Sequence, residues 1–339
     1  MTGRVLVTGG AGFIGSNLCE MLVSEGFQVT VLDNLSSGDH NLGFITDLGV
    51  DLIIGDICDS ELVFSQVSRA EVVVNLAAFV SVQDSFTRPK RNWQTNVDGT
   101  MNIIRACEKI GSRRLIHASS AAVYGDISDN PSSLPLIEGS TGNQLSPYAE
   151  SKTRNELDIE SSRERELDAV SLRFFNVYGP RQRTNGDYSA AIPIFIEKLQ
   201  NSENPIIFGD GLQTRDFIHV SDVCEAILAI IKSKATIRHS VYNIASGKQT
   251  SLIDLINIIE DSMNRIVSDW KGIEVQFTTE RSGDIRHSVA CVDRFSSDFE
   301  WSPKVSIING IFDLVSISNK NEKPSVFSSQ MIGEYSEKV

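Results

Sequence analysis

Three side chains that could together oxidise an alcohol lie near the middle of the sequence. Tyr148 and Lys152 are four positions apart, so both would lie on one face of a helix, and Ser120 ends an apolar segment earlier in the chain. A lysine ammonium favours the phenolate of a nearby tyrosine, and lowering a phenol pKa from about 10 to about 7 requires about 4 kcal/mol. Such a pair is common by chance, and the alternative is a partly exposed helix pair. Beside a bound nicotinamide cofactor, these groups form an acid/base set for alcohol oxidation.

A glycine-rich turn near the N-terminus could hold that cofactor. The apolar residues 5–8 are followed by Gly9, Gly12 and Gly15 in a GxxGxxG pattern, and then by a helix-length segment. Such glycines allow a tight turn, close approach of a pyrophosphate and close helix packing. Asp33 ends the next apolar segment, where a carboxylate binds the adenosine ribose and repels a 2′-phosphate. The pattern predicts an NAD site, and a structural turn with a surface aspartate is the alternative.

The elements that must hold these residues alternate between strand and helix through the first half of the chain. Short, continuously apolar segments are typical of strands covered on both faces, and they occur at 5–8, 29–33, 52–55, 72–76, 115–119 and 169–175. Helix-length segments lie between them, for example at 16–25, 96–110 and 152–167. Repeated units of strand and helix predict an α/β fold with a doubly wound parallel sheet.

After Gly179 and Pro180 the pattern changes. Helical segments at 190–199, 220–231 and 251–263 alternate with short strands and loops. We therefore predict a first domain at 1–178 and a smaller, mixed α/β domain at 179–317 that returns in places to the first sheet. A polar tail is expected at 318–339.

Composition limits the partners. The 339 residues carry a net charge of −13, which disfavours nucleic acid and anionic membranes as partners. No apolar segment is long enough to span a membrane, and no signal peptide is expected. Five cysteines lie far apart without a CxxC pair, which predicts a cytoplasmic protein without disulfides. His117, His219 and His287 lack the spacing typical of metal ligands, so no metal is expected.

Several motifs together resemble one known family. They are TGGAGFIG at 8–15, NLAA at 75–78, SSAAVYG at 119–125, SPYAESK at 146–152 and RFFNVYGPRQ at 173–182. With Asp33-Asn34 and Asp56-Ile57, they resemble the extended short-chain dehydrogenases/reductases, and within these the NAD-dependent nucleotide-sugar epimerases, over about residues 3–312. The nearest resemblance is to UDP-N-acetylglucosamine 4-epimerases. It implies a Rossmann domain followed by a nucleotide-sugar domain, with the sites in the cleft between them.

The resemblance also implies a reaction. Tyr148 would take the O4 proton of the sugar while C4 passes a hydride to NAD. Ser120 would hydrogen-bond the same oxygen, and Lys152 would hold the nicotinamide ribose and lower the pKa of Tyr148. The 4-keto sugar would then turn over, and return of the hydride to its other face would invert C4.

Two sets of binding residues follow from the resemblance. The NAD-binding set is Gly9, Gly12, Phe13, Ile14, Gly15, Asp33, Asn34, Gly38, Asp56, Ile57, Leu76, Ala77, Ala78, Asn96, Tyr148, Lys152 and Phe175. The substrate-binding set is Ser81, Ser120, Tyr148, Asn176, Ala190, Phe208, Arg215, Arg281, Asp284 and Ser288. Within it, Arg215 and Arg281 would bind the two phosphates and Asp284 the ribose. Without the family, each arginine would more often be a surface residue.

The residues after Ser120 separate activities within the family. Dehydratases carry an Asp-Glu pair there and GDP-mannose 3,5-epimerases a nearby cysteine, whereas this chain has Ala121-Ala122, so simple C4 epimerisation is expected. Ser288 falls on the position that filters the C2 substituent of the sugar, and segment 181–193 resembles UDP-N-acetylglucosamine 4-epimerases. We expect UDP-GlcNAc/UDP-GalNAc interconversion, with UDP-Glc/UDP-Gal as a second activity. The alternatives are a UDP-glucuronate 4-epimerase and a non-catalytic NAD-binding scaffold.

The resemblance implies a second copy of the chain as a partner besides the UDP-sugar. Dimers through a four-helix interface are usual in this family. The segments 96–110 and 150–167 would supply the helices, so a homodimer is expected.

Overall fold

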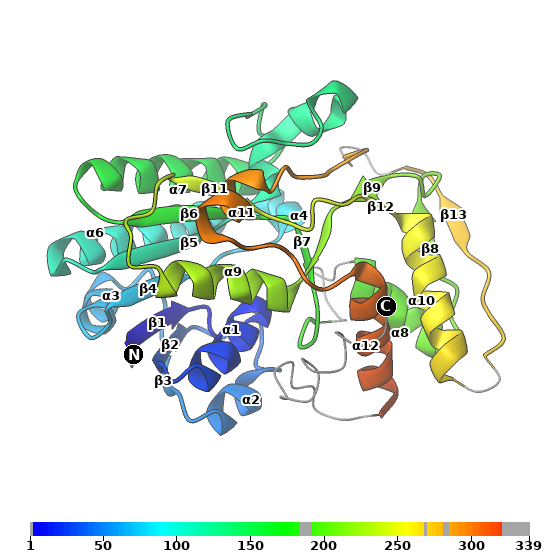
Figure 1. Ribbon diagram of the computed structural model, residues 1–339, viewed down its shortest axis with the longest axis horizontal. Coiled ribbons are helices and arrows are strands. Elements are labelled where there is room, and N and C mark those ends of the chain that lie inside the picture. The colour runs from blue at the N-terminus through cyan, green and yellow to red at the C-terminus, as the bar shows by residue number, and fades with distance from the viewer. Residues whose placement is uncertain (1–2, 184–190, 268–269, 281–284, 321–339) are drawn as a thin grey trace.

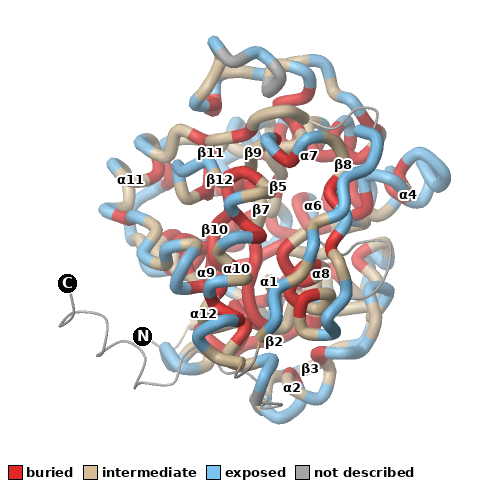
Figure 2. Tube along the Cα trace, turned by 90° about the vertical axis from the view of Figure 1, so that its right-hand side faces the viewer, coloured by how far each residue is buried: buried red, intermediate tan, exposed pale blue. Residues whose placement is uncertain are grey.

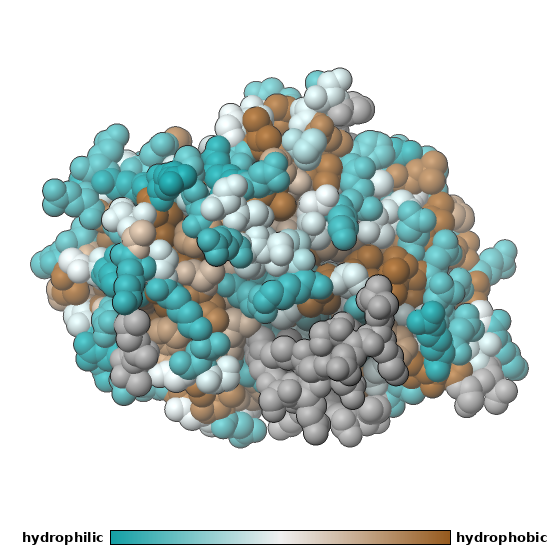
Figure 3. All heavy atoms as spheres, viewed as in Figure 1, coloured by the Kyte–Doolittle hydropathy of each residue, from teal (hydrophilic) through white to brown (hydrophobic). Residues whose placement is uncertain are grey.

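The computed structural model describes residues 3–183, 191–267, 270–280 and 285–320. A large sheet with helices on both faces occupies one end of the molecule, and a smaller group of helices and short strands occupies the other (Figure 1). Hydrophilic side chains dominate the surface in the same view, and hydrophobic ones form scattered patches (Figure 3). In the part of the chain that the structure describes, every helix is too short or too polar to cross a bilayer.

A seven-stranded sheet forms the centre of the larger part. All neighbouring strands are parallel, in the order β11-β6-β5-β4-β1-β2-β3. The strands are β1 (Arg4–Thr8), β2 (Gln28–Asp33), β3 (Asp51–Ile54), β4 (Val72–Asn75), β5 (Arg114–Ser120), β6 (Ala169–Phe174) and β11 (Val241–Ile244). The strand order reverses between β1 and β4, and ligands of such sheets bind at the carboxyl ends of the strands at that point. The predicted doubly wound sheet is confirmed.

Helices cover both faces of this sheet. One layer consists of α1 (Phe13–Ser24), α2 (Leu42–Asp47), α9 (Val220–Lys232) and α11 (Asp293–Phe299), and the other of α3 (Ser60–Val67), α6 (Thr100–Ile110) and α7 (Pro147–Glu164). Alternate side chains of a strand pack against opposite layers, as Val5 and Leu6 of β1 do. The most buried segments consequently gather in the interior, with exposed segments around them (Figure 2).

The smaller part has its own hydrophobic core. It is built from α8 (Ala191–Gln200), α10 (Leu252–Ile266), α12 (Ile307–Lys320) and the strand pairs β8 (Ile206–Phe208) with β13 (Gln276–Thr278), β9 (Thr214–Arg215) with β12 (Thr250–Ser251), and β7 (Asn176–Tyr178) with β10 (Phe217–His219). Short elements complete the described chain: α4 (Val82–Thr87), α5 (Pro89–Trp93), the π-helical turn η1 (Gln94–Gly99), η2 (Ala121–Asp129) and η3 (Pro131–Ser133).

The boundaries differ from the sequence-based ones in three places. The helix predicted at 96–110 begins as the π-helical turn η1 and becomes α-helical at Thr100. Helix α7 begins at Pro147, earlier than position 152, because Ser146 caps it. Helix α12 continues to Lys320, so residues 318–320 belong to a helix. Strand β11 and helix α9 come from the C-terminal half of the chain and pack on the first sheet.

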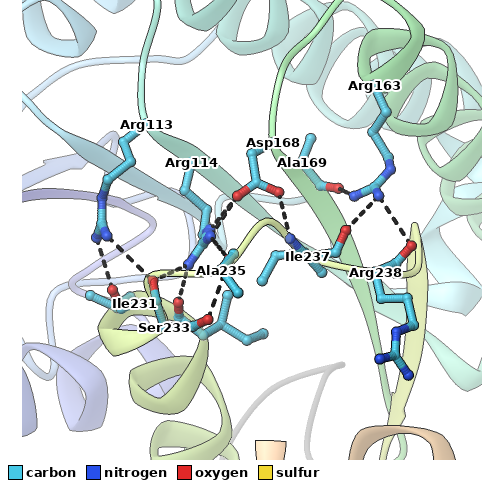
Figure 4. A network of polar contacts seen from close by, with 11 residues as sticks. Arg113, Arg114, Arg163, Asp168, Ala169, Ile231, Ser233, Ala235, Ile237 and Arg238 are labelled. Carbon is cyan, nitrogen blue, oxygen red and sulfur yellow. Dashed lines mark hydrogen bonds and ion pairs between the residues drawn. The ribbon is translucent and has the colours of Figure 1, made fainter. Parts of the chain in front are cut away.

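Arginine side chains hold the chain where it returns from α9 to β11 (Figure 4). Arg114 binds Asp168 and donates to the carbonyls of Ser233 at 2.9 Å and Ala235 at 2.7 Å. Arg163 donates to the carbonyl of Ile237 at 2.6 Å. These donors satisfy carbonyls at and beyond the C-terminus of α9, which a helix leaves unpaired. These hydrogen bonds fix the segment that leads into β11, which pairs with β6 at the edge of the sheet.

Candidate active site

The turn between β1 and α1 leaves room for a ligand close to the backbone. Gly9 has φ +70°, and a Cβ on it would lie 2.7 Å from the backbone nitrogen of Ala77, in the segment after β4. A Cβ on Gly15 would overlap the carbonyl oxygen of Gly9. Only glycine fits at these two positions. The N-terminus of α1 follows at once, and its unpaired N–H groups favour a phosphate.

A cavity of about 460 Å³ lies where the strand order reverses. It is lined by most residues of the predicted NAD-binding set, namely Gly9, Gly12, Phe13, Ile14, Gly15, Asp33, Asn34, Gly38, Ile57, Leu76, Ala77, Ala78, Tyr148, Lys152 and Phe175. A glycine turn, a helix N-terminus and a strand-end carboxylate in one cavity fit a dinucleotide.

Asp33 is held rigidly at the wall of this cavity. One carboxylate oxygen accepts the N–H of Ala11 at 2.9 Å, and the other accepts the N–H of Leu35 at 2.8 Å. Burial raises the pKa of Asp33, and these two bonds oppose the rise because they favour the ionised form. Each oxygen has a further lone pair that can accept a ribose hydroxyl.

The predicted catalytic residues line the same cavity. Ser120 is the last residue of β5, and Tyr148 and Lys152 lie on the buried side of α7. The ammonium of Lys152 donates to the carbonyl of Ala118 at 2.8 Å and lies 5.9 Å from the centre of the Tyr148 ring. The three groups therefore stand together at the carboxyl end of the sheet.

The start of α7 sets the position of two of these residues. Ser146 is the N-cap, and its hydroxyl accepts the N–H of Ala149 at 3.1 Å. Pro147 occupies the first position, where its missing N–H costs nothing. The helix thus begins directly before Tyr148, and Lys152 follows one turn later on the same face.

Burial controls the proton affinities of this pair. It raises the pKa of Tyr148, and a hydrogen bond from Ser120 opposes that rise. Burial also lowers the pKa of Lys152 to about 8, against the attraction of Glu156. The Lys152 ammonium contacts the Ala118 carbonyl, and Ser120 is the group that opposes the rise in the Tyr148 pKa. The lowering of that pKa by Lys152 stays a prediction.

An ion pair that sequence reasoning missed lies behind the catalytic residues. Glu156 and Arg173 are buried and joined by two bonds, of 2.9 and 2.7 Å. Glu156 also accepts the hydroxyl hydrogen of Ser119, the neighbour of Ser120. Glu156 lies one helical turn after Lys152, so it ties α7 to β6 through Arg173 and to the end of β5 through Ser119.

Two residues of the predicted NAD-binding set do not line the cavity. Asn96 is buried, and its side chain bonds both backbone groups of Phe79 and the hydroxyl of Ser151. These bonds hold the segment after β4. Asp56 accepts the amide of Asn34 at 2.8 Å, so it supports a residue that does line the cavity.

Part of the predicted substrate-binding set gathers around the carbonyl of Asp216. Asn176 donates to it from its backbone at 3.0 Å and from its side chain at 3.3 Å. Arg215 precedes it on β9, and the buried Ser288 donates its N–H to the carbonyl of Thr214 at 3.1 Å. These residues do not line the cofactor cavity. They form a second cluster, in the smaller part of the molecule.

The remaining predicted substrate residues are dispersed or outside the described chain. Ser81 is the N-cap of α4, where its hydroxyl accepts the N–H of Asp84 at 2.9 Å. Phe208 ends β8 and is half-buried. Ala190, Arg281 and Asp284 lie outside the described residues.

Further lining residues were not predicted. Among them are Ser36, Ser37 and His40 from the loop after β2, and Gln182 and Arg183 from the segment after β7. The turn-forming residues after Asp33 indicate a loop there. Nothing in the residues after β7 indicates that this segment comes close to the loop after β2. Within the described residues, His, Cys, Asp and Glu side chains do not gather in groups of three or more that could hold a metal ion.

A doubly wound sheet whose switch point holds both a glycine turn and a Ser-Tyr-Lys set defines an NAD-dependent enzyme of the short-chain dehydrogenase/reductase type. The family model described as NAD dependent epimerase/dehydratase matches residues 5–245. The chain belongs to this family, and its cofactor is NAD.

Proteins similar to this chain over more than nine tenths of its length are named as 4-epimerases of different UDP-sugars. The UDP-glucose 4-epimerase of Mycolicibacterium smegmatis is 34% identical over 91% of this chain and 96% of its own length. A UDP-N-acetylglucosamine 4-epimerase from Methanobrevibacter ruminantium M1, solved with UDP-N-acetylmuramic acid, is 36% identical with a TM-score of 0.86, over 95% of this chain and 99% of that one. A UDP-glucuronic acid 4-epimerase from Bacillus cereus, solved with UDP-glucuronic acid and NAD, is 28% identical with a TM-score of 0.82, over 92% and 98%.

Proposed function

We propose that this protein is an isomerase that inverts C4 of a UDP-hexose, and that its substrate pair is UDP-GlcNAc and UDP-GalNAc, with UDP-Glc and UDP-Gal as a second pair. The observation that carries the proposal is the placement of Ser120, Tyr148 and Lys152 on one cavity with the glycine turn and Asp33. An alcohol carbon held there would face an acid/base set and a nicotinamide at once.

The side chains divide the work between them. Tyr148 removes the proton from O4 of the sugar and returns it when the ketone is reduced, while Ser120 hydrogen-bonds the same oxygen. NAD, when bound, accepts a hydride from C4 and gives it back. Lys152 would hold the nicotinamide ribose beside Tyr148. Net inversion requires the 4-keto sugar to present its other face before the second hydride transfer.

The residues beside this set favour epimerisation over loss of water. Ala121 and Ala122 form the first turn of η2 directly after Ser120 and carry no titratable group. A 4,6-dehydration needs an acid and a base at C5 and C6 in addition to the groups at O4. Epimerisation needs only the groups that are present.

The choice of an N-acetylated sugar rests on Ser288. The family resemblance puts this residue at the position that filters the C2 substituent, where a serine leaves more room for an acetamido group than a tyrosine would. Its N–H is bound to the Thr214 carbonyl, on the strand that carries Arg215. Supporting it is the UDP-N-acetylglucosamine 4-epimerase relative, at 36% identity, against 28% for the glucuronic acid enzyme. The alternative enzyme is a UDP-glucuronate 4-epimerase. The alternative to an enzyme is a non-catalytic NAD-binding scaffold.

A panel of UDP-sugars tests the proposal. Purified protein is incubated without added NAD with UDP-GlcNAc, UDP-Glc and UDP-glucuronate, and the products are identified by NMR. We expect conversion of UDP-GlcNAc to UDP-GalNAc to be fastest, and Tyr148→Phe to convert it at least about 10²-fold more slowly than wild type. Faster conversion of UDP-glucuronate would overturn the sugar assignment, and no conversion of any sugar would favour the scaffold.

We also propose a homodimer built on α6 and α7. The two helices lie side by side and are linked by the Arg165–Glu108 ion pair at 2.7 Å. Leu157 of α7 is 57% exposed, and Ile110 of α6 is also exposed, so this face leaves apolar surface open. Light scattering should give the mass of two chains, and Leu157→Glu should give one. A wild-type monomer would contradict the dimer.

The compartment is a separate proposal. All five cysteines are free thiols, three of them buried, which suits a reducing environment and therefore the cytoplasm. Cell fractionation with an antibody against the protein would check it. Recovery from an oxidising compartment would contradict it.

A further inference from the structure

The segment of residues 179–183, which we call the strap, forms part of the cofactor cavity although it follows β7, at the start of the smaller part. Gln182 and Arg183 of the strap line the cavity. The loop after β2 lines it next to them, with Ser37 and Gly38. Arg183 donates to the carbonyl of Ser37, and a Cβ on Gly38 would lie 3.0 Å from the Arg183 guanidinium. The strap and the loop together therefore wall the Asp33 end of the cavity.

Arg181 anchors the strap to helices α1 and α2. Its side chain is 5% exposed and donates to Asn17 at 2.7 Å and to Glu20 at 2.8 Å, both on α1. The guanidinium also lies 4.0 Å from the centre of the Phe44 ring on α2. A guanidinium with two acceptors and an aromatic face is held in one position.

The strap backbone is fixed by further bonds. The carbonyl of Pro180 accepts the amide of Asn17 at 3.1 Å, and the carbonyl of Arg181 accepts the amide of Asn41 at 3.3 Å. Arg181 has φ +67°, a left-handed conformation that residues other than glycine seldom adopt. Such a conformation persists only where its surroundings hold it, and here the surroundings are α1 and the loop before α2.

We infer that the strap retains NAD between turnovers and that Arg181 is its positioning residue. Arg181 does not line the cavity; it acts by holding Gln182 and Arg183 against the loop after β2. A dinucleotide in the cavity can leave at this end only if the strap separates from the loop and from α1. The anchors therefore set the rate of NAD release. This inference concerns the cofactor and holds whichever sugar is the substrate.

The test compares NAD release from variants of the whole protein. Protein loaded with NAD is diluted into NAD-free buffer, and the NAD that stays bound is measured over time by rapid desalting. Arg181→Ala should release NAD at least about 10-fold faster, since that ratio needs a loss of only about 1.4 kcal/mol. Arg181→Lys should release NAD at a rate between those of wild type and Arg181→Ala, because an ammonium can reach Glu20 but cannot also bridge Asn17. With saturating NAD added, Arg181→Ala should recover its turnover.

A matched control separates retention from general stability. Arg163→Gln removes another arginine that binds carbonyls, remote from the cavity, and should lower the melting temperature without changing NAD release. In case Arg181→Ala does not fold, Asn41→Ala with Arg183→Ala removes bonds between strap and loop and leaves the Arg181–Glu20 pair intact. That double variant should also release NAD faster. Release at the wild-type rate from every foldable strap variant, or equal acceleration by Arg163→Gln, would overturn the inference.

Discussion

A buried carboxylate at the junction of three segments allows a sharp prediction. Asp216 uses one oxygen to accept the N–H and the hydroxyl of Ser246, at 2.8 and 2.6 Å. The other oxygen accepts the N–H of Gly247 at 3.0 Å and the N–H of Ala290 at 3.2 Å. Asp216 follows Arg215, and Ala290 follows closely after Ser288. The carboxylate thus ties together the chain segments that carry the predicted substrate residues.

The substitution Asp216→Asn should be costly because an amide cannot accept on both sides. With its oxygen toward Ser246, the amide nitrogen would face the N–H groups of Gly247 and Ala290, which would lose their acceptor. Each buried, unsatisfied donor costs about 1–3 kcal/mol, so the free energy of unfolding should fall by about 2–6 kcal/mol. The KM for the UDP-sugar should rise as the segment before Ala290 loosens. Bound NAD should be unchanged, because Asp216 does not line the cofactor cavity.

Urea unfolding and steady-state kinetics measure both effects. Asp126→Asn is the control, since that exposed carboxylate also accepts two bonds, from the backbone and side chain of Asn143, which water can replace. We expect its unfolding free energy to stay within about 0.5 kcal/mol of wild type. If Asp216→Asn loses less than about 1 kcal/mol and keeps its KM, the carboxylate does not organise this junction.

Four further predictions follow from the site and the fold. Tyr148→Phe should lose about 10²–10⁴-fold in kcat with nearly unchanged substrate affinity, and near wild-type turnover would remove Tyr148 as the base. Ser288→Tyr should cut kcat/KM for UDP-GlcNAc by about 5- to 150-fold and affect UDP-Glc much less; equal losses would show that Ser288 is not the filter. Because burial lowers the pKa of Lys152 to about 8, its ammonium is present below that pH and lost above it, so kcat should fall above pH 8. The same fall of kcat above pH 8 in Lys152→Arg would show that Lys152 is not its cause. Arg114→Ala leaves the partly buried Asp168 unpaired and should lower the free energy of unfolding by about 3–5 kcal/mol in urea melts, and a loss below about 1 kcal/mol would contradict the role given to this pair.

The features that sequence reasoning predicted are those with a local signal. The glycine turn, Asp33 and the strand-end serines each adjoin an apolar strand, and parallel strands bring such ends to one edge of a sheet. The spacing of Tyr148 and Lys152 on a capped helix is equally local. These residues could therefore be placed before any contact was known.

The features that were missed depend on contacts between distant positions. Arg181 finds Glu20 and Phe44 across the domain, and nothing in their neighbouring residues marks the pairing. The pair of Glu156 with Arg173 is of the same kind. Asn96 shows how a predicted cofactor contact can also serve the fold: its side chain binds the backbone of the segment after β4 and does not line the cavity.

The fate of a label at C4 tests the proposed reaction most directly. UDP-GlcNAc carrying deuterium at C4 is incubated in ordinary water with the purified protein and no added NAD, and the UDP-GalNAc formed is analysed by NMR and mass spectrometry. Removal and return of the same hydride within one turnover predicts that the product keeps its deuterium at C4. Product that has exchanged its C4 deuterium for solvent hydrogen would contradict the account.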